Sequence, residues 1–312
     1  MSFLAAYIMQ GRMQAIIVAS SLAFLSLILP LVSARVGIVS SVSVIVSLAS
    51  IALITLRRGA FEGLYVLVCS SAAASLLGLL LLGNYWIALL YSMMLWLPVW
   101  LISIVLREGR HLSLAVEFAV LIGMLGVVGF YLYEAAPSAM WKQALSQMVL
   151  SNAPANAPVD EIQRTLEVLS HYMTGVVAAG TVFGLLFGLF LGRWWQSVLY
   201  NPGGFKQEFL SLGTKPRLAM GSLAVVAVAW ASSGIFSEVA WNMTILLFVL
   251  YTCIGTAVLH AVFASMKHGR YLVPMFYLTL FLIPHAMLPV ALVGLSDAWM
   301  NLRNKISNQT NA

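Results

Sequence analysis

Charged side chains are scarce in this sequence. Asp, Glu, Lys and Arg make up 8% of the 312 residues, whereas hydrophobic residues make up 62%. A soluble domain usually carries about 25% charged residues. This deficit excludes an ordinary soluble domain and predicts a polytopic helical membrane protein.

Cysteine is scarce as well, and so are the signatures of catalysis. Cys69 and Cys253 both lie in apolar stretches, and no Cys or His cluster has the spacing of a zinc site. Free cysteine is readily buried as a small apolar residue, so we expect no disulfide. No serine-hydrolase, zinc-protease or P-loop motif is present. We therefore expect no enzymatic activity, no catalytic residues, no metal and no cofactor.

The excess of positive charge does not indicate a nucleic-acid partner. The formal net charge is +6, but the basic residues lie singly or in pairs at the ends of apolar runs. Lipid headgroups and membrane orientation explain that placement, so we expect the lipid bilayer as a partner and no nucleic acid.

Nine apolar runs have the length that a membrane-crossing helix requires, roughly 20 residues. Because lipid offers no water to open backbone groups, these runs are expected to be helices. The first run exceeds a signal-peptide core and is predicted to be retained. The predicted spans are 13–33, 36–56, 60–82, 85–106, 112–133, 172–192, 218–237, 241–265 and 272–295.

The connection 193–217 is the most basic in the chain, with four basic residues against Glu208 alone. Basic loops stay on the cytoplasmic side of a membrane. Placing this connection inside predicts a cytoplasmic N-terminus and leaves most flanking arginines and lysines inside. Three basic residues, Arg35, Lys142 and Arg164, fall on the outer side, and nine crossings would leave Arg303 and Lys305 outside as well.

The last run contains three prolines, Pro274, Pro284 and Pro289. Proline removes a helix hydrogen bond and kinks or breaks a helix. Residues 272–295 therefore form either one kinked crossing, which we favour, or two half-helices that re-enter. The side of the C-terminus depends on this choice.

A long polar insertion separates five spans from four. Apolar residues recur at helical spacing on both sides of a break at 152–158, and acidic residues outnumber basic ones. This pattern predicts a periplasmic amphipathic helical hairpin. The expected divisions are membrane helices (1–133), the outer hairpin (134–171), further membrane helices (172–296) and a polar C-terminal segment (297–312).

The inner connection contains a second amphipathic pattern. After a turn at 201–204, Phe205, Phe209 and Leu212 share one helical face. Two interpretations stay open. The segment is a cytoplasmic interfacial helix in the headgroup layer, or it docks a cytoplasmic or membrane protein partner.

Small residues recur every four positions in the first span, at Ala15, Ala19 and Ala23. Such a stripe lets helix backbones approach closely. It serves either packing within the chain or docking of another subunit.

Four ionisable residues inside the spans are candidates for ligand binding. A charge at the membrane centre costs about 2.5–3.5 kcal/mol on insertion scales, so such residues suggest function. Glu117 and His260 are expected at similar depth, where they could pair or bind a ligand. The alternative is that each finds only local hydrogen bonds.

The other two candidates are Glu62 and His285. Glu62 follows Arg57 and Arg58, so an ion pair with either arginine is the alternative to a ligand. His285 lies among prolines that free backbone carbonyls, which could face a ligand cavity. The alternative is a hydrogen-bonded core histidine.

Four short motifs carry a resemblance to a known family. They are YIMQGRMQ (7–14), LRRG (56–59), NPGGFKQEF (201–209) and GLSDAWMNLR (294–303). In this order they resemble the YybS-like family of bacterial polytopic membrane proteins, whose function is unassigned. That family is grouped by fold with the S components of energy-coupling-factor transporters and with MreD. The resemblance implies a bacterial cytoplasmic (inner) membrane protein.

The resemblance also implies two functions. In S components a small-residue stripe on the first helix docks the coupling subunit, and Ala15 and Ala19 match that stripe. We therefore expect a small-molecule binding or uptake component with a small-molecule ligand. The alternative is a non-transporting scaffold of the cell envelope that binds protein partners, as MreD-like proteins do.

Overall fold

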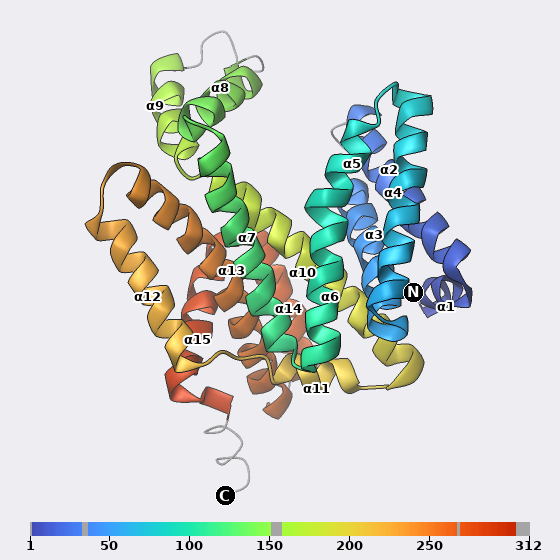
Figure 1. Cartoon of the computed structure of the whole chain (residues 1–312). Helices are drawn as coiled ribbons and strands as arrows, with labels where there is room; N and C mark the ends of the chain where they lie inside the picture. The colour runs from blue at the N-terminus through green and yellow to red at the C-terminus, as the bar shows by residue number, and fades with distance from the viewer. Residues whose placement is uncertain (1, 33–36, 151–157, 267–268, 304–312) are drawn as a thin grey trace, which may run out of the picture. The chain divides into compact units, whose positions relative to one another are not determined.

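The computed structural model describes residues 2–32, 37–150, 158–266 and 269–303. Every regular element in these ranges is a helix (Figure 1). The predicted all-α polytopic class is confirmed. Cys69 and Cys253 are both free thiols, as expected.

Seven helices are long and apolar enough to cross a membrane. Two further predicted spans form shorter apolar helices, α12 (Pro216–Ala231) and α14 (Gly269–Leu282). The seven long ones are α2 (Arg12–Val32), α3 (Gly37–Arg58), α4 (Ala60–Leu82), the stretch Trp86–Gly109, α7 (Leu112–Tyr133), α10 (Met173–Tyr200) and α13 (Gly234–Ser265).

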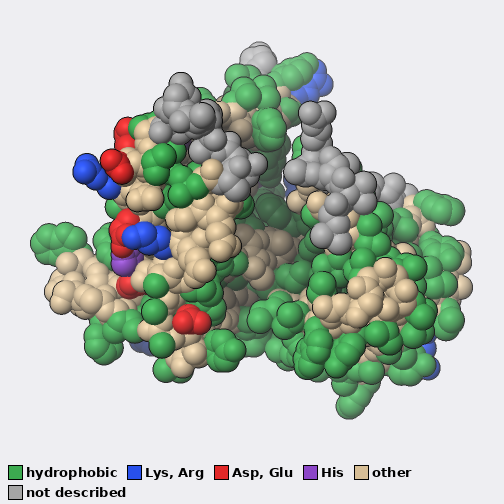
Figure 2. Space-filling view, turned by 90° about the horizontal axis from the view of Figure 1, so that it is seen from above, with side chains coloured by type: hydrophobic (Ala, Val, Ile, Leu, Met, Phe, Trp, Pro, Cys, Tyr) green, Lys and Arg blue, Asp and Glu red, His purple; other side chains and the backbone are tan. Residues whose placement is uncertain are grey.

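Large apolar side chains cover the outside of these helices. Phe61 is 89% exposed, and Leu132 and Trp230 are each 84% exposed. Figure 2 shows hydrophobic side chains over much of the viewed face, with few charged ones, most of them at its left. Such a surface is unfavourable in water and matches the lipid-facing side of membrane helices. The chain is accordingly a multi-pass membrane protein.

The stretch Trp86–Gly109 contains an irregular turn. It begins as α5 (Trp86–Tyr91), passes through a π-helical turn (Ser92–Trp96) and continues as α6 (Leu97–Gly109). The buried Trp96 donates its Nε1–H to Ser47 Oγ at 3.0 Å. The π turn thus brings a side chain of this stretch onto α3.

The chain forms two compact units. The first comprises residues 1–119 and 183–211. It includes α1 (Ser2–Gln10), a helix that the apolar pattern does not predict. Helix α3 forms its centre, and every residue of α3 from Val46 to Leu56 is buried. Gly192 of α10 lies so close to α3 that a Cβ there would be 3.0 Å from the Ala49 carbonyl oxygen.

The second unit comprises residues 120–182 and 212–312. It contains α8 (Pro137–Leu150) and α9 (Val159–Ser170), which pack together as the predicted helical hairpin. An ion pair between Lys142 and Glu167 joins the two helices. The predicted break at 152–158 lies outside the described residues except for Pro158.

The predicted final span is divided in two. Helix α14 ends at Leu282, a 3-10 turn occupies Pro284–Ala286, and α15 (Met287–Met300) follows. Proline disfavours helical geometry in the residue before it, and Ile283 leaves the helix with φ −129° and ψ 81°. Residues 272–295 therefore form two separate helices and not one kinked helix.

The two halves form a helical hairpin. Helix α14 begins beside the end of α13, and Arg303 after α15 donates a hydrogen bond to the carbonyl of Leu212, just before α12 (Figure 1). Helices α13 and α15 touch through glycines, since a Cβ on Gly255 would lie 1.9 Å from the Val290 oxygen. The segment consists of two half-helices, as in the re-entrant alternative, and its path through the membrane stays a prediction.

Candidate functional site

The small-residue stripe is used inside the first unit. Ala15 and Ala19 are 0% exposed and Ala23 is 1% exposed, because α2 packs against α3 and α4. Ser47 Oγ of α3 donates to the Ala19 carbonyl at 2.9 Å. Packing within the chain accounts for the stripe in this structure, and docking of another subunit there would require these helices to move.

Glu62 forms an ion pair with a partner that the sequence does not suggest. Arg12 Nε donates to Glu62 Oε2 at 2.8 Å, and Arg12 Nη2 contacts Oε1. Arg58 instead donates to the carbonyl of Met9, and Arg57 lies over the ring of Tyr200. The predicted pairing of Glu62 with Arg57 or Arg58 is wrong, and Glu62 joins α2 to α4.

The remaining ionisable candidates are divided between the two units of the chain. Glu117 is half-buried in the first unit, and its pairing with His260 stays a prediction. His260, in the second unit, places Nδ1 2.8 Å from the Thr256 carbonyl and packs against Tyr277. His285 is exposed in the 3-10 turn, so no enclosed ligand cavity surrounds it.

The short helix predicted after 201–204 is present as α11 (Gly204–Leu210). Its Phe205 and Phe209 pack on Phe190 of α10, with ring centroids 6.1 and 5.9 Å apart. The apolar face of α11 thus rests on its own chain, and docking of a partner through Phe205 or Phe209 stays a prediction.

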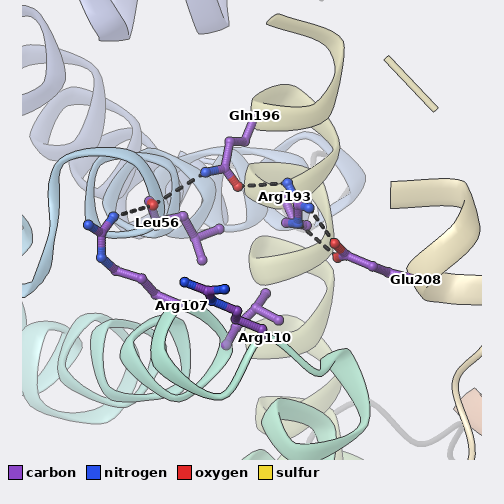
Figure 3. A pocket seen from close by; sticks show the side chains of 7 residues that line it. Leu56, Arg107, Arg110, Arg193, Gln196 and Glu208 are labelled. Carbon is purple, nitrogen blue, oxygen red and sulfur yellow. Dashed lines mark hydrogen bonds and ion pairs between the residues drawn. The ribbon is translucent and has the colours of Figure 1, made fainter. Parts of the chain in front are cut away.

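A pocket of about 280 Å³ lies in the first unit, beside the end of α3 (Figure 3). We call it the arginine pocket, because three arginines and a single acid line it. Its lining residues are Leu56, Leu106, Arg107, Arg110, Arg193, Gln196 and Glu208.

The end of α6 positions two of these arginines. Arg110 caps the helix in the left-handed conformation, with φ 55°, and its N–H donates to the Leu106 carbonyl at 3.0 Å. Arg107, one turn earlier, donates from Nη1 to the Leu56 carbonyl at 2.6 Å. Gln196 Nε2 donates to the same carbonyl at 3.3 Å. Both side chains satisfy an oxygen that the last turn of α3 leaves open.

In the third arginine, Arg193, each of the three side-chain nitrogens has a partner. Arg193 Nε donates to Glu208 Oε2 at 2.8 Å, Nη2 contacts Oε1, and Nη1 donates to Gln196 Oε1 at 2.8 Å. Its side chain is only 14% exposed, so water screens this pair weakly. The pair fastens α11 to α10 and closes one wall of the pocket.

Arg110 differs from the other two arginines, because its guanidinium makes no described contact with another side chain or carbonyl. Its side chain is exposed, points into the pocket in Figure 3, and has no hydrogen-bond or ion-pair partner among the described residues. The acid nearest to Arg107 is Glu108, at 3.6 Å, beyond a good hydrogen bond. A guanidinium fork with free N–H groups is suited to an anion with paired oxygens. The pocket can therefore hold an anion.

A second polar cluster, in the second unit, is closed. We call it the Asn242 network; it consists of Tyr131, His171, Gly175, Glu238 and Asn242. Tyr131 donates to one Glu238 oxygen at 2.6 Å, and His171 Nδ1 lies 3.0 Å from the other. Asn242 donates to the carbonyls of His171 and Glu238 at 2.7 Å, and its Oδ1 accepts the N–H of Gly175. This cluster ties α7, α10 and α13 together.

Sequence reasoning missed the arginine pocket, because arginines at the ends of apolar runs are explained by membrane orientation alone. Two signals were available. Arg107 and Arg110 are three residues apart, the spacing at which helical side chains are neighbours. Arg193 and Glu208 have opposite charges on either side of a turn.

No group of three or more His, Cys, Asp or Glu among the described residues could hold a metal ion. Comparisons with protein-family models, curated proteins and solved structures find no match to this chain. The resemblance to the YybS-like family therefore rests on the sequence motifs alone.

Proposed function

We propose that this protein is a small-molecule binding component of a bacterial cytoplasmic membrane, and that the arginine pocket holds an anionic ligand. The observation that carries the proposal is the Arg110 guanidinium, which faces the pocket with its donors free. Three arginines against Glu208 leave the lining positive, which attracts an anion from solution.

Four arginines lie near the C-terminal ends of α3, α6 and α10: Arg57, Arg58, Arg107 and Arg193. Basic residues gather at the cytoplasmic ends of membrane helices, which supports a cytoplasmic position for the pocket. An S-component-like role in uptake is consistent with such a site. The alternative role as an envelope scaffold stays a prediction.

The test is ligand-induced stabilisation of the full chain in neutral detergent. Thermal unfolding is followed with phosphate, sulfate and succinate at constant ionic strength. A ligand that binds the folded state raises the unfolding temperature by mass action. We expect at least one anion to do so for the natural protein and not for Arg110→Gln.

The matched control is Arg217→Gln, which removes an exposed arginine at the start of α12. It makes the same change in net charge outside the pocket and should respond like the natural protein. Equal responses of all three proteins, or no response of any, would overturn the proposal.

A further inference from the structure

We infer that the anion of the arginine pocket is a phosphate ester; this inference rests on the proposed function and narrows the ligand. The geometry of the free donors is the first argument. Arg107 and Arg110 are three residues apart at the end of α6, and both line the pocket. Among the described residues, Arg110 has no side-chain partner, and Arg107 donates only from Nη1, to the Leu56 carbonyl. A carboxylate has two coplanar oxygens, which one guanidinium fork satisfies. A tetrahedral phosphate has oxygens in more than one plane and can bridge both forks.

The charge of the lining is the second argument. Glu208 neutralises Arg193 directly, which leaves Arg107 and Arg110 as the cations available to a ligand. Glu108 reduces this charge only weakly, because its carboxylate is 3.6 Å from Arg107 Nε and its side chain is 74% exposed. A phosphate monoester carries about −1.5 to −2 at neutral pH, which matches two arginines better than a single negative charge does.

The depth of the pocket is the third argument. Leu56 and Arg107 lie in the last turns of α3 and α6, where two membrane-crossing stretches end. The adjoining Trp194 is 38% exposed, and tryptophan is typical of the membrane–water interface. A ligand in the pocket therefore lies at the level of lipid headgroups, and basic pockets between membrane helices bind such groups.

The size of the pocket limits the ligand. Its volume of about 280 Å³ is close to the lower end of the ~300–1,000 Å³ range of ligand pockets. It suits one phosphate with a small substituent. Both the headgroup of phosphatidic acid, which is a lipid phosphomonoester, and a small soluble phosphate monoester have this chemistry.

The experiment has a soluble arm and a lipid arm. In neutral detergent, binding of glycerol 3-phosphate is measured by calorimetry beside binding of succinate. In nanodiscs, native mass spectrometry measures retention of phosphatidic acid, a lipid phosphomonoester, against phosphatidylcholine. We expect a phosphate in at least one arm to bind about tenfold more weakly to Arg110→Gln, a loss equivalent to 1.4 kcal/mol. Arg110→Lys keeps the charge without the fork and should fall between, whereas Arg217→Gln should bind as the natural protein does.

The outcomes separate the proposed anion pocket from the narrower inference of a phosphate ester. Arg110-dependent binding in the lipid arm identifies a headgroup, and binding in the soluble arm identifies a free ester; either supports the inference. Succinate binding that depends on Arg110, without phosphate binding, overturns the phosphate ester and leaves the proposed function standing. If no anion binds, or if binding is the same in Arg110→Gln, both proposals fail. Because Arg110 has no partner to lose, misfolding is not expected to obscure the result.

Discussion

The arginine pocket and the Asn242 network are both clusters of charged and polar side chains, but they differ in whether their hydrogen-bond donors have partners. Asn242 is 0% exposed, and its amide donates and accepts within the network. Arg110 is exposed, and no described group uses its donors. Both clusters lie at helix ends and contain a carboxylate. Unused hydrogen-bonding capacity, rather than the presence of charge, is therefore what distinguishes the proposed binding site from the structural cluster.

The difference has an energetic cause. A buried polar group without a partner costs about 1–3 kcal/mol, so a buried network is stable only when it is closed. An exposed guanidinium keeps its water until a ligand replaces it, so the pocket can retain free donors at little cost. Stability and binding should accordingly depend on different residues.

The largest expected effect comes from opening the Asn242 network. Asn242→Ala removes the acceptor of the Gly175 N–H, one of the open donors in the first turn of α10, and removes the side-chain donor to the His171 carbonyl. We expect a loss of about 2 kcal/mol in the free energy of unfolding. Denaturant unfolding in mixed micelles measures it.

Arg110→Gln is the contrasting variant in the same assay. It has no described partner to lose, so its free energy of unfolding should stay within about 0.5 kcal/mol of the natural protein. Equal destabilisation by both variants would remove the distinction between the two clusters.

A smaller loss of stability is expected when the ion pair in the wall of the pocket is broken. Arg193→Gln breaks the pair with Glu208 that fastens α11 to α10. We expect about 1 kcal/mol of destabilisation, confined to that region. Amide hydrogen exchange over 204–210 should become several-fold faster, because local opening becomes easier.

Lys206→Gln is the control for that measurement, because Lys206 is exposed on the same helix. Its exchange should match that of the natural protein. Unchanged exchange in Arg193→Gln would show that the phenylalanine contacts alone hold α11.

The smallest effect is expected at the surface of the α8–α9 hairpin. The hydrogen bond from Lys142 lowers the pKa of Glu167 below its ordinary value. A carboxyl with a lowered pKa in the folded state contributes stability above its unfolded pKa of about 4.3, and this contribution is lost as the pH falls through the folded value. Both side chains are about half exposed, so the effect is small.

The measurement compares the hairpin at pH 7 and near pH 3 by hydrogen exchange. Glu167→Gln should lower protection at pH 7 and reduce its pH dependence, whereas Glu161→Gln, an exposed acid on the same helix, should do neither. The same pH dependence in all three proteins would exclude a role for the Lys142–Glu167 pair.

Apolar runs predict most of the helices but not where each one ends. Helix α10 continues to Tyr200 instead of residue 192, because Arg193, Trp194 and Trp195 are compatible with a helix even though they leave the apolar pattern. Helix α13 begins at Gly234 instead of residue 241 for a similar reason. The division at Pro284 required knowing which neighbours compensate for the broken hydrogen bonds, and a single sequence does not contain that information.

The arginine pocket could not be predicted, because it depends on contacts between distant segments. Gln196 reaches the Leu56 carbonyl across 140 residues of sequence. Gly188 and Gly192 permit this approach, since a Cβ on Gly188 would lie 2.5 Å from Leu48 Cβ. Spacing along one helix identifies Arg107 and Arg110 as neighbours, but only packing of α3, α6 and α10 makes them line a pocket.

The hairpin of α14 and α15 determines whether the chain makes an odd or an even number of membrane passes. Helix α14 leaves from the end of α13, and α15 returns after the turn at Pro284, so the pair adds no net pass. The chain end then lies on the side of α12's first residue, where Arg303 meets Leu212. Arg303, an exception to the charge bias in a nine-pass chain, then shares a side with Lys215 and Arg217. A reporter fused to the C-terminus and one inserted near residue 206 should consequently sense the same compartment.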